Sequence, residues 1–475
     1  MLPASGFTAA ELADAWPAQV DLASALAALA RQSDTPARCI FVVDDDPTGV
    51  QSLPDAEILT AWESDLLEQV WEAQRDLLYI LANTRALPET QAIAVCREIV
   101  ERVRTLAEQH RVTLCPISRS DSTLRGHYPA ELGPFEELFS QLPDGQILAP
   151  AYPEAGRIVL GARHFVFDHV RERFVPVTET DFSRDPTFSF RSADLPQWIE
   201  EKSHGSMAAS DAVTISLSEL RNGGAPGVAR RLQTVANNAP VVADAIDYGD
   251  LLILAAGSRL AERQGKRFVY RTAAPFVRAM LGLRPDDKDD SGVRIRNLGP
   301  GLVLVGSYVK LTTAQLRLAQ ALPTVESIEL PVAELLEPDT AQRAVEKICT
   351  RVDFELCQGK TALVFTSREL LSQTDKLKHL QIGERISSAL VSIPGKLKRL
   401  PKWILAKGGI TSHEVLTTGL GAKRARVVGH PATGVSLLKL GIDSHAQGLY
   451  YVVFPGNVGG PSTLAEVIDR LRGQA

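Results

Sequence analysis

The chain has 475 residues, 45% of them hydrophobic, and carries a formal net charge of −6. This length exceeds one ordinary hydrophobic core and predicts two domains, while lysine and arginine are scattered rather than clustered, which argues against nucleic acid as a partner. The five cysteines show no CxxC spacing, and no run of about 18 apolar residues or basic leader segment occurs, so the sequence predicts a cytoplasmic protein without a membrane partner.

Residues 1–37 predict an amphipathic helical extension. Leu22, Leu26 and Leu29 recur at helical spacing and would form one apolar face. We expect this face to pack either on the first domain or on another subunit. A homodimer is therefore one possible assembly.

Residues 38–285 predict the first α/β domain. Apolar strands alternate there with helical segments, at residues 39–43, 77–82, 112–117, 146–151 and 240–246. This alternation indicates a mostly parallel sheet covered by helices. Polar loops follow nearly every strand, and the carboxyl ends of parallel strands meet at one edge, so a ligand is expected at that edge.

A segment rich in charge, glycine and proline, residues 286–300, predicts a linker. A second α/β domain is expected over residues 301–475. Its alternating series comprises residues 301–307, 327–330, 361–367, 402–412, 425–430 and 448–460. The predicted fold class is therefore two α/β domains with mostly parallel sheets and an interdomain active-site cleft.

Three consecutive carboxylates, Asp44, Asp45 and Asp46, follow the first strand of this series. Adjacent carboxylates repel one another, so their presence at a strand end suggests a nearby cation, sugar hydroxyl or proton transfer. The alternative is a solvated acidic turn.

A second polar loop, residues 118–131, follows the strand at 112–117. Arg119 and Arg125 flank Asp121 in this loop, and two guanidinium groups beside a carboxylate suit an anionic substrate. Surface ion pairs are the alternative. Ser122 lacks a GxSxG elbow around it, so the sequence does not predict a serine hydrolase.

Glycine-rich loops in the second domain suggest a nucleotide. KGGITS (407–412) follows an apolar strand and leads into a helical segment, where backbone N–H groups can approach phosphate. A plain glycine turn with a capping serine is the alternative. Three more such loops follow strands, at residues 306–315, 429–435 and 454–460. The GKT at 359–361 precedes its strand and is not a P-loop.

Several of these motifs occur together, in the same order, in one family. The sequence resembles the four-carbon acid sugar kinase family from about Arg38 to the C-terminus. The matching motifs are DDDPTGVQ, SDSTLRG, APAYPEAGR, RTAAPFV, KGGITS, GHPATGVS and FPGNVGG. The chain departs from the family at Asp44 and Pro47, where many members have alanine and leucine, and at residues 118–120, where members commonly have a lysine.

The resemblance implies that the first domain binds a sugar acid and the second binds ATP. The implied substrate side, together with its loop neighbours, comprises Asp45, Asp46, Thr48, Arg119, Asp121, Ser122, Arg125 and Gly126. The implied nucleotide side comprises Ser307, Gly408, Gly409, Thr411, Ser412, Gly429, Gly434, Gly456 and Asn457.

The expected activity is an ATP- and Mg²⁺-dependent kinase acting on a hydroxyl of a small sugar acid such as threonate, erythronate or an oxo-tetronate. Asp46 or Asp121 would accept the hydroxyl proton, with Asp46 favoured, and Arg125 would hold the substrate carboxylate or the moving phosphoryl group. No residue is assigned to the metal. The alternatives are a metal-dependent lyase or aldolase of sugar acids and a non-catalytic metabolite-binding protein.

Overall fold

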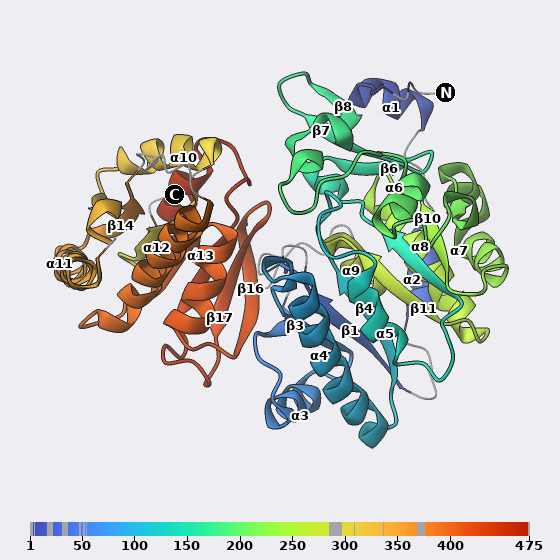
Figure 1. The fold of residues 1–475 in the computed structure, drawn as a ribbon, viewed down its shortest axis with the longest axis horizontal. Helices are drawn as coiled ribbons and strands as arrows, with labels where there is room; N and C mark the ends of the chain where they lie inside the picture. The colour runs from blue at the N-terminus through green and yellow to red at the C-terminus, as the bar shows by residue number, and fades with distance from the viewer. Residues whose placement is uncertain are drawn as a thin grey trace. The chain divides into compact units, whose positions relative to one another are not determined.

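The computed structural model describes most of the chain (Figure 1). The described residues are 3, 5–16, 22–30, 37–46, 49–50, 53, 55–284, 297–307, 309–335, 337–367 and 376–473. They divide into two compact units, the first comprising Met1–Leu53 and Trp62–Lys288, and the second Pro54–Ala61 and Asp289–Ala475. Each unit combines helices with a mostly parallel or mixed sheet, which confirms the predicted α/β class. No helix within the described residues has the length and apolar character to cross a membrane.

Within the described residues, the sheet of the first unit contains seven parallel strands in the order β3-β1-β4-β11-β5-β10-β9. Their bounds are β1 (Arg38–Asp44), β3 (Leu77–Leu81), β4 (Thr113–Arg119), β5 (Gly145–Ala149), β9 (Val213–Ile215), β10 (Ala239–Ala243) and β11 (Phe268–Thr272). The register aligns Asp44 with Arg119, and Arg119 with Thr272. The carboxyl ends of β1, β4 and β11 therefore meet at one edge.

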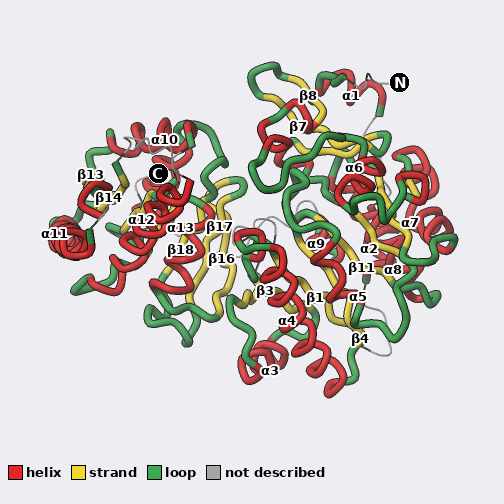
Figure 2. Tube along the Cα trace, viewed as in Figure 1, coloured by secondary structure: helices red, strands yellow, loops and turns green. Residues whose placement is uncertain are grey.

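The helices of this unit that follow the N-terminal extension include two packed groups. They are α3 (Ser64–Ala73), α4 (Glu89–His110), α5 (Gly133–Glu136), α6 (Leu195–Lys202), α7 (Leu217–Gln233), α8 (Tyr248–Arg263) and α9 (Ala274–Met280). Helix α4 packs against α3 and α5, whereas α8 packs against α7 and α9 (Figure 2). Most of α8 is buried, which is typical of a helix enclosed by other layers.

The N-terminal extension packs on the first unit. Helix α2 (Leu22–Leu29) contacts α8 and α7, and Phe7, just before α1 (Ala9–Ala15), pairs through its backbone with Phe174. Phe174 belongs to a small antiparallel sheet of β6 (Arg157–Leu160), β7 (Arg163–Asp168) and β8 (Arg173–Pro176). The ring of Phe7 packs between Phe165 and Phe174, so the extension stabilises this small sheet.

The second unit has a mixed sheet. Parallel strands follow the order β13-β14-β12-β15-β18, and β17, β16 and β2 continue the sheet antiparallel. The strand bounds are β2 (Glu57–Leu59), β12 (Leu302–Val305), β13 (Val325–Leu330), β14 (Thr361–Thr366), β15 (Trp403–Lys407), β16 (Arg424–Ala432), β17 (Val435–Leu440) and β18 (Tyr450–Phe454). The helices are α10 (Lys310–Gln320), α11 (Pro338–Cys357), α12 (Lys376–Lys396), α13 (Gly409–Glu414) and α14 (Thr463–Arg472).

Two features of the second unit differ from the sequence expectations. Segment 429–435, expected as a loop after a strand, forms the end of β16 and the turn into β17. Strand β2 comes from the first part of the chain and pairs with β16 through Leu59 and Arg424. Its pairing depends on a contact across more than 360 residues of sequence, which local pattern does not reveal.

Candidate active site

Asp44 is a buried structural anchor at the end of β1. Its carboxylate accepts hydrogen bonds from Nη1 of Arg119 at 2.8 Å, from the backbone N–H of Asp46 at 2.9 Å and from the hydroxyl of Tyr79. Burial raises the pKa of the Asp44 carboxyl, and the charge of Arg119 opposes this shift. A side chain at Gly49 would overlap the carboxylate, so Gly49 lies tightly against Asp44.

Asp45 is also buried, with 2% of its surface exposed, but its carboxylate is held differently. Neither oxygen accepts a hydrogen bond from any residue that the structure describes. Nη1 of Arg85 lies 3.8 Å from Oδ1. Burial raises the pKa of Asp45 to about 7, Glu131 adds to this shift, and the charge of Arg85 opposes it.

Arg85 connects the other two carboxylates of the site. Its Nη2 forms an ion pair with Asp46, and its Nη1 lies 3.7 Å from Oδ1 of Asp121. Asp121 also accepts hydrogen bonds from Nε of Arg125 at 2.6 Å and from the hydroxyl of Thr123. Burial alone would raise the pKa of Asp121, but Arg125 and Arg85 hold it well below its usual range. Asp121 is therefore an anion throughout the physiological pH range.

Two guanidinium groups share one aromatic ring beside Asp121. Arg125 lies 5.1 Å and Arg157 5.8 Å from the ring centroid of Phe182, distances typical of cation–π contacts. Nη1 of Arg157 donates a 2.7 Å hydrogen bond to Oγ of Ser122. Sequence reasoning did not single out Arg157 or Phe182, although Arg157 ends the APAYPEAGR motif.

Arg271, at the end of β11, completes the cationic side. Its Nη1 donates to Oγ of Ser118 at 3.2 Å and to Oε2 of Glu131 at 3.3 Å. A methyl group at Gly126 would lie 2.6 Å from Nη2 of Arg271 and 2.9 Å from Oδ2 of Asp45. Gly126, with φ +127°, therefore lets its loop approach both side chains.

The predicted substrate-side residues thus gather at one edge of the first sheet, except that Thr48 lies outside the described residues. The edge carries guanidinium groups from Arg85, Arg119, Arg125, Arg157 and Arg271 beside the carboxylates of Asp44, Asp45, Asp46, Asp121 and Glu131. Guanidinium groups bind carboxylate or phosphate, and carboxylates accept hydrogen bonds from hydroxyls. This chemistry suits a polyhydroxylated anion.

The second unit gathers several predicted nucleotide-side residues where β12, β15 and β18 end. A methyl group at Gly456 would lie 2.7 Å from Oγ of Ser307, and one at Gly408 would lie 3.3 Å from Cβ of Ser307. The hydroxyl of Thr312 donates to the carbonyl of Gly456 at 2.9 Å and lies 3.1 Å from Oγ of Ser307. Gly408 has φ +121°, a conformation that favours glycine.

Other predicted nucleotide-side residues stabilise the loops at this edge. Oγ of Ser412 is fully buried and donates to the carbonyl of Ala406 at 2.7 Å, so it holds the loop. Thr411 packs against Gly306, and a side chain at Gly434 would contact Val458. The remaining predicted members are Gly409 at the start of α13, the buried Gly429 within β16, and the exposed Asn457 after β18.

Lys407, at the end of β15, is buried completely beside these loops. Its Nζ donates to the carbonyl of Pro455 at 3.0 Å and lies 3.8 Å from the ring centroid of Phe454. This residue fixes the loop that carries Gly456. The first residue of KGGITS was not predicted as a site residue, because a lysine at a strand end more often faces solvent.

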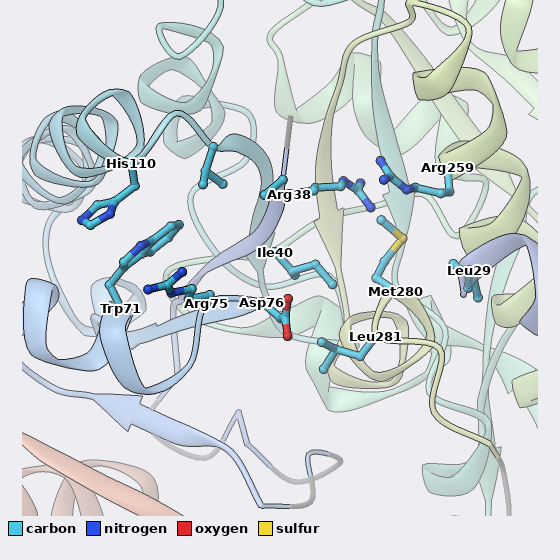
Figure 3. Close-up of a pocket in the computed structure, with 12 residues that line it drawn as sticks. Leu29, Arg38, Ile40, Trp71, Arg75, Asp76, His110, Arg259, Met280 and Leu281 are labelled. Atoms are coloured by element: carbon cyan, nitrogen blue, oxygen red, sulfur yellow. The ribbon is translucent and has the colours of Figure 1, made fainter. Parts of the chain in front are cut away.

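A cavity of about 310 Å³ lies at the opposite edge of the first sheet (Figure 3). Arg38 and Asp76, at the amino ends of β1 and β3, line it together with Trp71, Arg259 and Met280. None of the predicted site residues lines this cavity.

Among the described ranges of the chain, no group of three or more histidine, cysteine or acidic side chains has the geometry of a metal site.

Family comparisons agree with this division of chemistry. The family described as "Sugar-binding N-terminal domain" matches residues 40–280, about half of the chain, and the family described as "Nucleotide-binding C-terminal domain" matches residues 302–464. The chain belongs to the four-carbon acid sugar kinase family. The acidic and arginine-rich edge thus lies in the family's sugar-binding domain, and the glycine-lined edge in its nucleotide-binding domain.

Two solved structures share the fold of this family member but have low sequence identity to it. A putative tRNA synthase from Salmonella typhimurium LT2 aligns with a TM-score of 0.65 at 16% identity, covering 90% of this chain and 98% of that one. Haemophilus influenzae protein HI1011, of family DUF1537, aligns with a TM-score of 0.62 at 18% identity, covering 91% and 100%. A comparison with curated proteins returned no significant match. These likenesses establish the fold alone.

Proposed function

We propose that the protein is an ATP-dependent kinase that phosphorylates a hydroxyl of a small, four-carbon sugar acid such as threonate, erythronate or an oxo-tetronate. One observation carries the proposal: a cluster of carboxylates and guanidinium groups occupies the carboxyl edge of a sugar-binding domain in a chain that also has a nucleotide-binding domain. Phosphoryl transfer mainly needs aligned reactants and neutralised negative charge, and the two domains would supply these requirements separately.

The arginine pair on Phe182 would bind the acidic end of the substrate. Arg125 and Arg157 present two guanidinium groups next to Asp121, and these groups could bind a carboxylate or the transferred phosphoryl group. Asp46 and Asp121 would accept hydrogen bonds from substrate hydroxyls. The substrate would then be held at both its acidic and its hydroxyl ends.

The glycine-lined edge of the second unit would hold ATP. Gly408 and Gly456 leave space beside Ser307, where phosphate oxygens can approach backbone N–H groups. Mg²⁺ would be held chiefly by the nucleotide phosphates with one or two carboxylates, its usual mode in kinases, and its protein ligand is left unassigned. When bound, it neutralises phosphate charge. A homodimer and a cytoplasmic location stay predictions.

A lyase or aldolase that holds a divalent ion through the aspartates is the main rival. The observed pairing disfavours it, because Arg119, Arg85 and Arg125 already engage Asp44, Asp46 and Asp121, respectively. It would also leave the nucleotide-binding domain without a role. A metabolite-binding protein would use the same residues without turnover.

The decisive experiment is coupled ADP release with Mg-ATP and a panel of four-carbon sugar acids. We expect one or a few of these acids to give turnover well above the rate without acceptor. Calorimetric binding of an acid with no ADP release across the panel would contradict the kinase and favour the metabolite-binding alternative. Cleavage of an acid without ATP consumption would favour the lyase.

A further inference from the structure

The four aspartates at the carboxyl edge of the first sheet are not equivalent. Asp44 accepts three hydrogen bonds, Asp46 is paired with Arg85, and Asp121 is bound by Arg125. Asp45 is buried to the same degree, yet it accepts no hydrogen bond from the described residues. A buried carboxylate without a hydrogen-bond partner is costly unless a ligand or a proton completes it.

We propose that Asp45 is the proton acceptor of the phosphoryl transfer and takes its proton from the sugar-acid hydroxyl that attacks ATP. The inference rests on the proposed function and assigns to Asp45 the role that the sequence favoured for Asp46. A carboxylate bound to arginine is a poor base, because the guanidinium stabilises its charged form. The contacts of Asp46 and Asp121 therefore suit them to positioning substrate rather than to accepting a proton.

The position of Arg85 supports this role. Its Nη1 lies 3.8 Å from Oδ1 of Asp45 and 3.7 Å from Oδ1 of Asp121, too far for hydrogen bonds, and this buried group has no hydrogen-bond acceptor among the described residues. A substrate hydroxyl placed next to Asp45 could accept from Nη1 and donate to Oδ1 at the same time. One hydroxyl would thereby satisfy two buried groups that otherwise lack hydrogen-bond partners among the described residues.

The proposed step needs no reactant other than ATP and the sugar acid. The hydroxyl oxygen forms a bond to the γ-phosphorus of ATP, and the bond from that phosphorus to the β–γ bridging oxygen breaks, with its electron pair leaving on ADP. The hydroxyl proton passes to the Asp45 carboxylate and then to solvent. The products are the phosphorylated acid, ADP and one proton.

The charges that face Asp45 come from every element around it. They are Asp44 and Asp46 on its own segment, Arg85 after β3, Arg119 on β4, Asp121 and Arg125 in the loop after β4, Glu131 in the turn before α5, and Arg271 on β11. Burial is the largest influence and raises the pKa of Asp45 to about 7. The carboxyl would then gain and lose its proton close to neutral pH, as an efficient general base does.

The test compares Asp45→Asn with Asp46→Asn in the full-length protein, using the acid that gives the highest rate of ADP release. We expect Asp45→Asn to lower kcat at least about a hundredfold, with KM changed by no more than about threefold. We expect Asp46→Asn to act mainly by raising KM for the acid. The wild-type profile of kcat/KM should fall as pH decreases below about 7; Asp46→Asn should retain this fall and Asp45→Asn should lose it.

Binding of a non-hydrolysable ATP analogue and thermal melting check that each variant is folded. An active wild type whose Asp45→Asn variant keeps more than about a third of kcat, or keeps the acidic fall in kcat/KM, overturns this inference alone. A wild type that releases no ADP with any acid overturns the proposed function and this inference with it.

Discussion

Nη1 of Arg157, on strand β6 of the small sheet, donates a 2.7 Å hydrogen bond to the hydroxyl of Ser122 in the loop after β4. This bond ties an element outside the parallel sheet to the centre of the candidate site. Burial lowers the pKa of Arg157, although Asp121 opposes the shift, because the side chain has little access to water. The small sheet therefore contributes a charged group to the candidate site rather than only covering the domain.

Arg157→Lys should weaken binding of the sugar acid. Lysine keeps the charge but loses the planar group that lies over Phe182 while bonding Ser122, so we expect KM for the acid to rise about tenfold while KM for ATP stays constant. Initial rates with each substrate varied in turn measure both constants. Arg171→Lys, an exposed arginine of the same small sheet, is the matched control and should leave both unchanged. An equal rise in both constants would contradict the assigned role.

Gly126→Ala should lower kcat/KM at least about tenfold. The added methyl group would press on Arg271 and Asp45 and would also strain a backbone with φ +127°. Gly205→Ala separates these effects, since Gly205 has φ +81° but open space around its Cα. A Gly126→Ala variant as active as Gly205→Ala would contradict the prediction. Steady-state kinetics and thermal melting measure the two contributions.

Asp45→Asn should be more stable than the wild type at pH 8, and this difference in stability should be smaller at pH 5. The Asp45 pKa is about 7 in the folded state and near 4 when unfolded, so between these values the unfolded state loses its proton first and stability falls as pH rises. The wild type bears the full cost above pH 7, which is on the order of 4 kcal/mol. Asparagine removes this cost. Denaturant unfolding of both proteins at the two pH values measures it, and a variant less stable than wild type at pH 8 would contradict the prediction.

Gly408→Ala should raise KM for ATP at least about tenfold and leave KM for the acid within about twofold. The new methyl group would occupy the space beside Ser307 and Thr411 and strain a backbone with φ +121°. Gly448→Ala, in the same unit with φ +78° and no neighbour within 4 Å, is the control for strain. A selective effect on the acid instead would remove Gly408 from the nucleotide side.

Phe7→Ala should destabilise the protein and indirectly weaken sugar-acid binding. Phe7 is 1% exposed and packs on the small sheet that carries Arg157, so its loss removes a buried ring, a change that costs about 3 kcal/mol or more in other cores. Thermal melting and KM for the acid measure both effects. Val170→Ala, at a 94% exposed position in the turn between β7 and β8, should change neither. An unchanged melting temperature in Phe7→Ala would contradict the packing of the extension.

The hydrophobic periodicity and the polar residues at strand ends predicted much of the fold. Asp44 and Arg119 follow apolar runs of similar length, and the parallel arrangement predicted from those runs places them side by side. The small sheet could not be predicted in this way, because β6 to β8 are short and the position of Phe182 depends on tertiary contacts. For the same reason, the burial of Ser412 and its bond to Ala406 were not evident from a hydroxyl in a glycine-rich loop.

The different environments of the aspartates also could not be predicted from the sequence. Asp45 and Asp46 are neighbours of identical chemistry, and they differ in their burial and in the position of Arg85, which comes from the segment after a different strand. Electrostatic environment depends on groups brought together by folding, so a motif can identify a site without assigning its members.

Strand β2 limits how this architecture can be divided. Residues 54–61 lie early in the chain, but Ile58 and Leu59 are buried in the second unit and Arg426 binds Asp55 through two hydrogen bonds. A gene fragment that encodes only residues 289–475 would leave the edge of β16 open to other chains. During translation, the second unit also cannot complete its sheet from its own contiguous segment. The two units are thus poorly suited to modular recombination. A chimaera that exchanges either domain would also have to exchange the segment that contains β2.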